Sequence, residues 1–304
     1  SALAQSAIGD ALPQMGAAGC RPCCCADAQE KEKVICGGDS CHAAGNKDSV
    51  FGFEEEHSAA AVFAEGHMET SRTAKDAVPL VLISDPGQDL DDEMTYIMLR
   101  YLVDEGQVEV RGIVTTLAPA FDRARLCRGT LDTLGLYGVP IGVGTDGGDT
   151  EGKHKAATFE DWAHTYMPVK YSESSLSFEP GQRLLFRLYR AAAPKSLTLV
   201  VIAALKDPAL FLRDSEELFV EKTKEVVIMG GVESWDQGAK EPVTLSPDTA
   251  HNNMFDANSS RFFYRRCQEL GVPLIVVSRW TAYASKVPRS CYDDLAALGS
   301  AIGC

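Results

Sequence analysis

The stretch "VPLVLISDPGQDLDDEMTYIML", residues Val78–Leu99, joins an apolar run to an acidic loop and then to a helical pattern. The run Val78–Ile83 predicts a strand that is covered on both faces. Apolar side chains then recur at helical spacing within Glu93–Val103, at Met94, Ile97, Met98, Tyr101 and Leu102. A buried strand followed by a helix is typical of the start of an α/β fold.

The same alternation of strand and helix continues along the chain. We expect strands at Val108–Thr115, Val139–Val143, Leu197–Ile202, Glu225–Met229 and Pro273–Val277, and helices at Asp122–Leu136, Gly181–Ala193, Pro208–Leu212 and Ser259–Leu270. The polar stretch Asp149–Pro180 is predicted to be a long loop. Together these elements predict an open, mostly parallel sheet with helices on both faces.

The composition of the chain indicates which kinds of molecule it can bind. The chain has 304 residues, is 45% hydrophobic and carries a formal net charge of −14. That charge repels nucleic acid and anionic membranes, so a small neutral or cationic ligand is favoured. The longest apolar stretch, Leu197–Leu205, is too short to cross a bilayer, and no secretory signal is visible. We therefore expect no transmembrane segment and a cytoplasmic location.

The N-terminal region differs from the rest of the chain. Six of the ten cysteines fall in the first 41 residues, which contain few large apolar side chains. We predict a disordered, cysteine-rich arm over residues 1–77 and a folded domain over residues 78–304. For the stretch Cys20–Cys41, three interpretations stay open: incidental thiols in a tail, a lipid tether or redox-active tail built on its contiguous cysteines, and a metal site.

The acidic loop points to a cation. Asp85, Asp89, Asp91 and Asp92 follow the first predicted strand, at the edge of the sheet where ligands bind in open α/β folds. Four carboxylates at this position repel one another and lose solvation, so a bound cation would stabilise them. Because the donors are all oxygens, Ca²⁺ or Mg²⁺ is favoured over zinc. The alternative is a solvated loop with one aspartate capping the helix.

Two common motifs do not fit this loop. An EF-hand that starts at Asp89 would need glycine where Met94 stands. A nucleotide phosphate loop would need more glycine and a lysine.

The sequence resembles the nucleoside hydrolases, the inosine-uridine-preferring N-ribohydrolases. "VLISDPGQDLDDEMTYIML" is similar to their opening strand, Asp-Pro-Gly loop and helix. Four later blocks also resemble the family in order: "RGIVTTLAPAFDRARLCRGTLDTLGLYGVPIGVG", "SLTLVVIAALKDPAL", "EVVIMGG" and "TAHNNMFDANSSRFFYRRCQELGVPLIVV". The resemblance implies the nucleoside hydrolase fold and Ca²⁺-dependent hydrolysis of a nucleoside to a base and ribose. It also implies a homo-oligomer.

The resemblance also implies roles for individual residues. Asp85 would be a metal ligand and the general base, and the main-chain oxygen of Ile202 would be a further metal ligand. The family's aspartate pair matches Asp91 and Asp92, but the loop here is two residues longer, so Asp89 competes for the same roles. We assign Asp89 and Asp92 to the metal. The ribose would be bordered by Asp91, Met229, Asn252 and Asn253.

Three departures weaken the enzymatic interpretation. The family's Gly-Asn after the second strand is replaced by "LAPA" at Leu117–Ala120, and its glutamate for the ribose 5′-hydroxyl is replaced by Ala250. The family's His-Asp-Pro segment would lie beyond Cys304, so we expect the domain to be C-terminally incomplete. The alternative function is therefore a catalytically degenerate binding or assembly protein.

Other side chains have candidate roles near the site. For His251 two interpretations stay open: an acid on the base side of the pocket, or a side chain that points away from the pocket because Asn252 points into it, which is the expected arrangement. Asp256 is expected to cap the following helix. Two interpretations stay open for the long loop: His154 and His164 contact a nucleobase or are exposed, and Trp162, Tyr166 and Tyr171 stack on a base or pack the loop against the domain. Trp235, which follows "MGG", is better placed for stacking on a base.

Overall fold

The computed structural model describes residues 77–148, 158–160, 163, 177–234, 243–297 and 299. The cysteine-rich arm predicted over residues 1–77 lies outside this part of the chain, apart from Ala77. The candidate base contacts His154, Trp162, His164, Tyr166, Tyr171 and Trp235 also lie outside the described residues.

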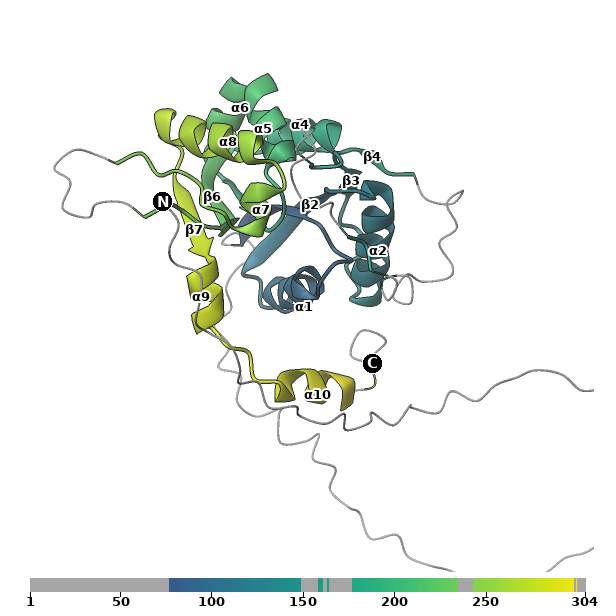
Figure 1. Ribbon diagram of the computed structural model, residues 1–304. Helices are drawn as coiled ribbons and strands as arrows, with labels where there is room; N and C mark the ends of the chain where they lie inside the picture. Colours follow the sequence, from purple (N-terminus) through teal and green to yellow (C-terminus); the bar gives the residue numbers. More distant parts are fainter. Residues whose placement is uncertain are drawn as a thin grey trace, which may run out of the picture. The chain divides into compact units, whose positions relative to one another are not determined.

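Strands and helices alternate through the described domain (Figure 1). The strands are β1 (Val78–Ser84), β2 (Val108–Thr115), β3 (Ile141–Val143), β4 (Glu179–Pro180), β5 (Leu197–Val201), β6 (Thr223–Gly230) and β7 (Leu274–Ser278). The helices are α1 (Asp91–Asp104), α2 (Ala120–Thr133), α4 (Gly181–Ala191), α5 (Lys206–Asp214), α6 (Glu216–Lys222), α7 (His251–Met254), α8 (Ala257–Glu269), α9 (Arg279–Ala284) and α10 (Ser290–Ala297).

The strands form one parallel sheet in the order β4-β3-β2-β1-β5-β6-β7. The first strand, β1, therefore lies inside the sheet, where Leu82 pairs with Ile113 of β2 and with Val200 of β5. The chain winds in one direction from β1 to β4 and in the other from β5 to β7. The predicted α/β fold is confirmed, and the loop after β1 lies where the strand order reverses.

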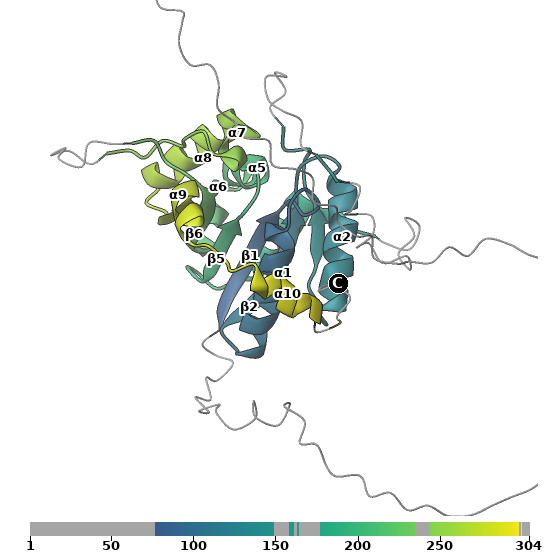
Figure 2. The same cartoon turned by 60° about the horizontal axis from the view of Figure 1, so that its bottom comes forward.

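Alternate residues of β1 pack on opposite faces of the sheet. Val81 and Ile83 belong to a core with α4, α5, α6 and α8, whereas Leu80 and Leu82 belong to a core with α1 and α2. Figures 1 and 2 show these two groups of helices on the two sides of the sheet. Successive side chains of a strand point to opposite faces of the sheet. Both faces are covered by helices here, which explains why nearly every residue of β1 is apolar.

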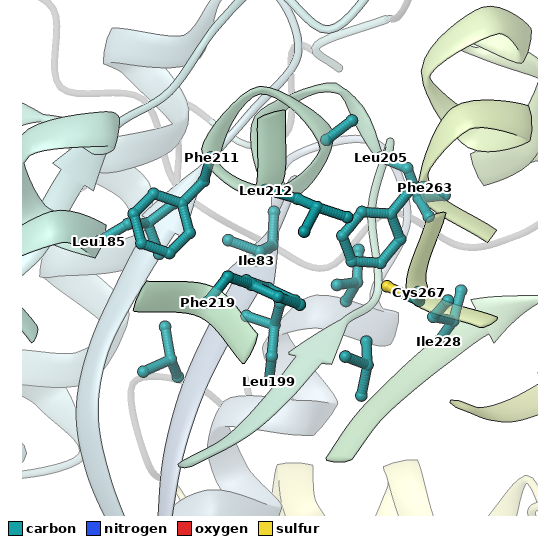
Figure 3. Packing of buried hydrophobic residues seen from close by; sticks show 14 of the residues in the cluster. Ile83, Leu185, Leu199, Leu205, Phe211, Leu212, Phe219, Ile228, Phe263 and Cys267 are labelled. Carbon is teal, nitrogen blue, oxygen red and sulfur yellow. The ribbon is translucent and has the colours of Figure 1, made fainter. Parts of the chain in front are cut away.

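Aromatic side chains fill the larger of the two cores. Phe219 lies between Phe211 and Phe263, with ring centroids 6.2 and 6.0 Å away at steep angles. Figure 3 shows the three rings grouped around Ile83, with Leu199 beside Phe219. All of these side chains are buried, so this core fixes α5, α6 and α8 on the same face.

The structure adds two details to the predicted elements. Met98 and Tyr101 of α1 are 60% and 62% exposed, and the helix instead buries Tyr96 and Leu99. Asp92, Tyr96 and Leu99 share one face of the helix by their spacing, and this buried face does not include Met98 and Tyr101. The predicted loop Asp149–Pro180 ends in strand β4, which is only two residues long.

Other predicted features are present. Asp256 precedes α8, and its Oδ1 accepts a hydrogen bond of 2.9 Å from the backbone N of Ser259, so the predicted cap is confirmed. Cys127 and Cys267 are buried free thiols. Within the described part of the chain, no helix has the length and apolar character needed to span a membrane.

Candidate functional site

The acidic loop connects β1 to α1 at the carboxyl edge of the sheet. Asp85 and Asp92 are 8% and 1% exposed, whereas Asp89 and Asp91 are exposed to solvent. The backbone N of Asp85 donates a 3.1 Å hydrogen bond to Oδ1 of Asp92, so the two ends of the loop are tied together. This bond leaves the other oxygen of Asp92 available to a ligand.

Three carboxylates of the loop converge. Asp89, Asp91 and Asp92 each offer an oxygen, and these oxygens lie within 4.8 Å of one another. Burial, together with nearby carboxylates, raises the pKa of Asp85 to about 7 and raises the pKa of Asp92 well above its usual value. Such carboxylates bind protons more readily in the absence of a counter-charge. The donor set is that of a hard divalent cation, and the residues present fit such an ion.

A buried arginine holds the backbone of this loop. Arg123 of α2 is fully buried, and its Nη1 donates to the main-chain oxygens of Asp85 at 2.5 Å and Pro86 at 2.8 Å. Its Nη2 donates to the oxygens of Ala118 at 3.1 Å and Thr158 at 2.7 Å. Arg123 thus links the acidic loop to two other segments through carbonyl oxygens and places a positive charge beneath the carboxylates.

The glycine of the loop is required by its packing. Gly87 has a φ of 106°, which side-chain-bearing residues rarely adopt. A Cβ atom built on it would lie 2.3 Å from Cε2 of Phe159, whose ring lies 5.6 Å from the Arg123 guanidinium carbon. The Asp-Pro-Gly sequence therefore serves the packing of the loop against Phe159 and Arg123.

A cavity of about 220 Å³ opens beside the acidic loop. Its walls come from four places: the loop after β1, the ends of β5 and β6, the segment around α7, and α9. The residues that line it are Asp85, Gln88, Asp89, Asp91, Ile202, Met229, Gly230, Ala250, His251, Asn252, Phe255, Ser278, Arg279, Ala282 and Tyr283. Predicted site residues from distant parts of the sequence therefore meet in one cavity.

Asn252 connects the strand ends to the cavity. Its Nδ2 donates to the main-chain oxygens of Ile202 at 2.9 Å and Met229 at 3.0 Å. Both oxygens belong to the carboxyl ends of neighbouring strands, since Ile202 follows β5 and Met229 lies in β6. Asn252 therefore fixes the floor of the cavity and lines it as well.

Asn253 occupies a different environment. It is 1% exposed and is not among the residues that line the cavity. Its Nδ2 donates to the main-chain oxygens of Gly231 at 3.0 Å and Asp248 at 3.2 Å, and its main-chain oxygen accepts from Oγ of Ser260. These bonds hold α7 against the end of β6 and the start of α8. Asp92 is likewise absent from the cavity lining, although its carboxylate belongs to the acidic cluster.

Sequence reasoning did not place two basic residues, His251 and Arg279, in the cavity. His251 was expected to point away from the pocket, but it lines the cavity together with Asn252 because both lie on the short helix α7 rather than on a strand. Arg279 lines the cavity from α9, a six-residue helix that the apolar pattern does not reveal. The only signal for Arg279 was its position two residues after the predicted strand Pro273–Val277.

The sheet, the acidic loop after β1 and the cavity at the strand ends define the nucleoside hydrolase-like fold. The predicted resemblance to nucleoside hydrolases is confirmed at this level by solved structures of that fold. No protein-family model matches the chain, and no curated protein matches it either.

Particular solved structures are similar to this chain. The effector protein XOO4466 is 27% identical with a TM-score of 0.63, and the match covers 75% of this chain and 63% of that one. The type III effector XopQ, complexed with adenosine diphosphate ribose, is 27% identical with a TM-score of 0.61 and the same coverage. An inosine-uridine preferring nucleoside hydrolase from Bacillus anthracis is 16% identical, with a TM-score of 0.52 and 74% coverage of each chain. The chain thus spans about 63% of the length of the two effectors.

Proposed function

We propose that this chain hydrolyses the N-glycosidic bond of a ribonucleoside or a related N-ribosyl compound with the help of Ca²⁺. The observation that carries this proposal is the shared cavity, in which the Asp85 carboxylate and the Asn252 amide face the same space as the ends of β5 and β6. The nucleoside hydrolase-like fold supports the same reaction class.

The proposed cation site uses oxygens from two strand ends. Asp85, Asp89 and Asp92 would supply carboxylates from the loop after β1, and Ile202 would supply its main-chain oxygen from the end of β5. When bound, Ca²⁺ would supply positive charge that acidifies a water molecule and holds hydroxyl groups of the ribose. The positive charge would also offset the repulsion among the carboxylates.

Asp85 is proposed as the general base. Its carboxylate takes a proton from the attacking water, whose hydroxyl joins the anomeric carbon while the bond to the base nitrogen breaks. The departing base takes up a proton, for which we assign His251 on the cavity wall as the donor. Asp85 is 8% exposed, so its carboxylate is largely shielded from bulk water.

The ribose is proposed to lie between the loop and the end of β6. Asp91 accepts hydrogen bonds from ribose hydroxyls, Met229 supplies an apolar contact and Asn252 supplies its amide oxygen. For Asn253 we propose an indirect contribution, because its contacts hold α7 and thereby place Asn252.

A second candidate is a protein that binds a ribosyl compound without turnover. Ala250 lines the cavity with a methyl group, and Leu117, with a φ of 68°, is buried and brings no polar side chain to the site. The similar effector XopQ is complexed with adenosine diphosphate ribose, which favours ligands broader than simple nucleosides.

An assay for free base tests the proposal. Inosine, uridine and adenosine are each incubated with the protein in the presence of Ca²⁺ or of a chelator, and the released base is measured by chromatography. We expect Ca²⁺-dependent release that falls by about 10²–10⁴-fold in Asp85→Asn. Asp214→Asn is the control, since Asp214 is exposed and paired with Arg213 on α5. Full activity of Asp85→Asn would exclude Asp85 as the base. Ligand binding without base release by the wild type would support the second candidate.

A further inference from the structure

The cavity runs across four neighbouring strands. Its lining passes from the loop after β1 to Ile202 after β5, to Met229 and Gly230 of β6, and to Ser278 at the end of β7. These strands are adjacent in the order β1-β5-β6-β7. Since neighbouring strands lie about 4.8 Å apart, the backbone at the two ends of the cavity is separated by roughly 14 Å.

The two ends of the cavity carry opposite charge. Asp85, Asp89 and Asp91 lie at the β1 end, whereas Arg279 lies at the β7 end. Among the described residues that line the cavity, Arg279 is the single arginine or lysine. A ligand that fits both ends must therefore offer hydroxyl groups at one end and an anion at the other.

The contacts of Arg279 hold the guanidinium but leave donors for a ligand. Its Nη2 donates to Oδ2 of Asp248 and to Oγ1 of Thr249, each at 3.0 Å. Its Nε is buried and has no hydrogen-bond partner among the described residues. The side chain is 33% exposed, so part of the guanidinium faces open space. An arginine held in this way is preorganised to bind a planar or tetrahedral anion.

The wall between the two ends offers no carboxylate that would repel an anion. Ala250 precedes α7 and lines the cavity beside His251, and its backbone N donates a 2.7 Å hydrogen bond to Oδ1 of Asp248. Oδ1 and Oδ2 of Asp248 are thus engaged by Ala250 and Arg279, and Asp248 is not among the residues that line the cavity. The β7 end is therefore the part of the cavity that favours negative charge.

We infer that the β7 end of the cavity binds the phosphate of a 5′-phosphorylated ribosyl compound, with Arg279 as the residue that selects it. This inference rests on the proposed function, because it places the ribose hydroxyls at the acidic end. The 5′ carbon of the ribose then points away from the acidic loop and toward Arg279. The anionic group that ribosyl compounds carry on the 5′ carbon is a phosphate. The preferred substrates are nucleotides rather than nucleosides.

Titration calorimetry with adenosine and AMP in the presence of Ca²⁺ tests this inference, because the two ligands differ only in the 5′-phosphate. We expect the wild type to bind AMP about 10–100-fold more tightly than adenosine. Arg279→Met should remove this preference while adenosine binding stays within about 2-fold. Arg279→Lys should retain part of it, since the charge remains but the forked donors are lost.

Asp248→Asn is the matched control, because it removes the same ion pair but leaves the guanidinium and an acceptor oxygen for Ala250. If Arg279 binds phosphate, this variant keeps the AMP preference; if Arg279 only stabilises the fold, both variants behave alike and the inference is overturned. Equal affinity of the wild type for both ligands would also overturn it and leave the proposed function standing. Binding of neither ligand would overturn the proposed function together with the inference.

Discussion

Nη1 of Arg123 donates a 2.5 Å hydrogen bond to the main-chain oxygen of Asp85. The bond joins the start of the acidic loop to a guanidinium that has no exposure to solvent. Arg123 also binds the oxygens of Pro86, Ala118 and Thr158. The shape of the acidic loop therefore depends on the Arg123 guanidinium, which binds the backbone of the loop rather than its carboxylates.

Replacing Arg123 by methionine is expected to destabilise the fold. The substitution leaves several buried carbonyl oxygens without donors, and each lost bond to a charged group costs about 1.5–3 kcal/mol before relaxation. We expect a loss of about 3 kcal/mol or more in the free energy of unfolding, measured by urea denaturation. Arg100→Met, which breaks an exposed pair with Asp104, should change it by about 0.5 kcal/mol or less. Equal stability of the two variants would contradict the role of Arg123.

A bound cation is expected to stabilise the folded state. Ca²⁺ at about 100 times its Kd should raise the free energy of unfolding by about 2.7 kcal/mol, and a chelator should reverse the effect. Asp92→Asn should abolish most of this gain, because the buried carboxylate becomes a neutral amide while its hydrogen bond from Asp85 can be kept. Thermal unfolding with and without Ca²⁺ measures both effects. A wild type that is insensitive to millimolar Ca²⁺ would exclude the site.

Glu93 predicts a pH dependence of the metal-free protein. Its side chain is 6% exposed, neither carboxylate oxygen has a hydrogen-bond partner among the described residues, and burial raises its pKa to about 7. The folded chain then binds a proton that the unfolded chain releases near its ordinary pKa of 4.5. The free energy of unfolding therefore falls as pH rises from about 4.5 to 7, by up to about 3 kcal/mol.

The variant Glu93→Gln isolates this contribution. It should be more stable than the wild type at pH 8, and the difference should shrink toward pH 4, where both side chains are neutral. Urea denaturation in the presence of a chelator measures the difference. Glu217→Gln is the control, because Glu217 is exposed on α6. A stability difference for Glu93→Gln that stays constant across this pH range would contradict a buried, titrating carboxylate.

Much of the fold could be predicted because its strongest signals are local. The run Val78–Ile83 and the helix after it carry the periodicity of their own structure, and the acidic loop lies between them. The spacing of apolar residues in α1 predicts the helix correctly, but it does not predict which face of the helix is buried. Met98 and Tyr101 are exposed because they lie outside the face that Asp92, Tyr96 and Leu99 share. The spacing of apolar residues cannot predict the buried face of a helix when part of that face consists of carboxylates that belong to a functional site.

The rest depended on contacts between distant segments. Arg123 looks like an ordinary surface residue of a helix, and its burial follows from carbonyl oxygens near positions 85, 118 and 158. Arg279 and His251 lie on helices of six and four residues, too short for a periodic pattern. Sequence spacing also left Asn252 and Asn253 equivalent, since only the turn of α7 decides which of them reaches the cavity.

The two asparagines are therefore expected to respond differently to substitution. Asn253→Ala removes a buried amide that bonds to Gly231 and Asp248, so it should lower the free energy of unfolding by about 1–3 kcal/mol. Asn252→Ala should cost less stability, because its site opens to the cavity and water can replace the amide at the oxygens of Ile202 and Met229.

Ligand binding should show the opposite order. Asn252→Ala should weaken binding of a ribosyl ligand by about 10-fold, whereas Asn253→Ala should weaken it only to the extent that α7 loosens. Calorimetry at a temperature where both variants are fully folded separates the two effects. A fully stable Asn253→Ala variant that no longer binds ligand would show instead that Asn253 contacts the ligand directly, and the roles assigned to the two residues would have to be exchanged.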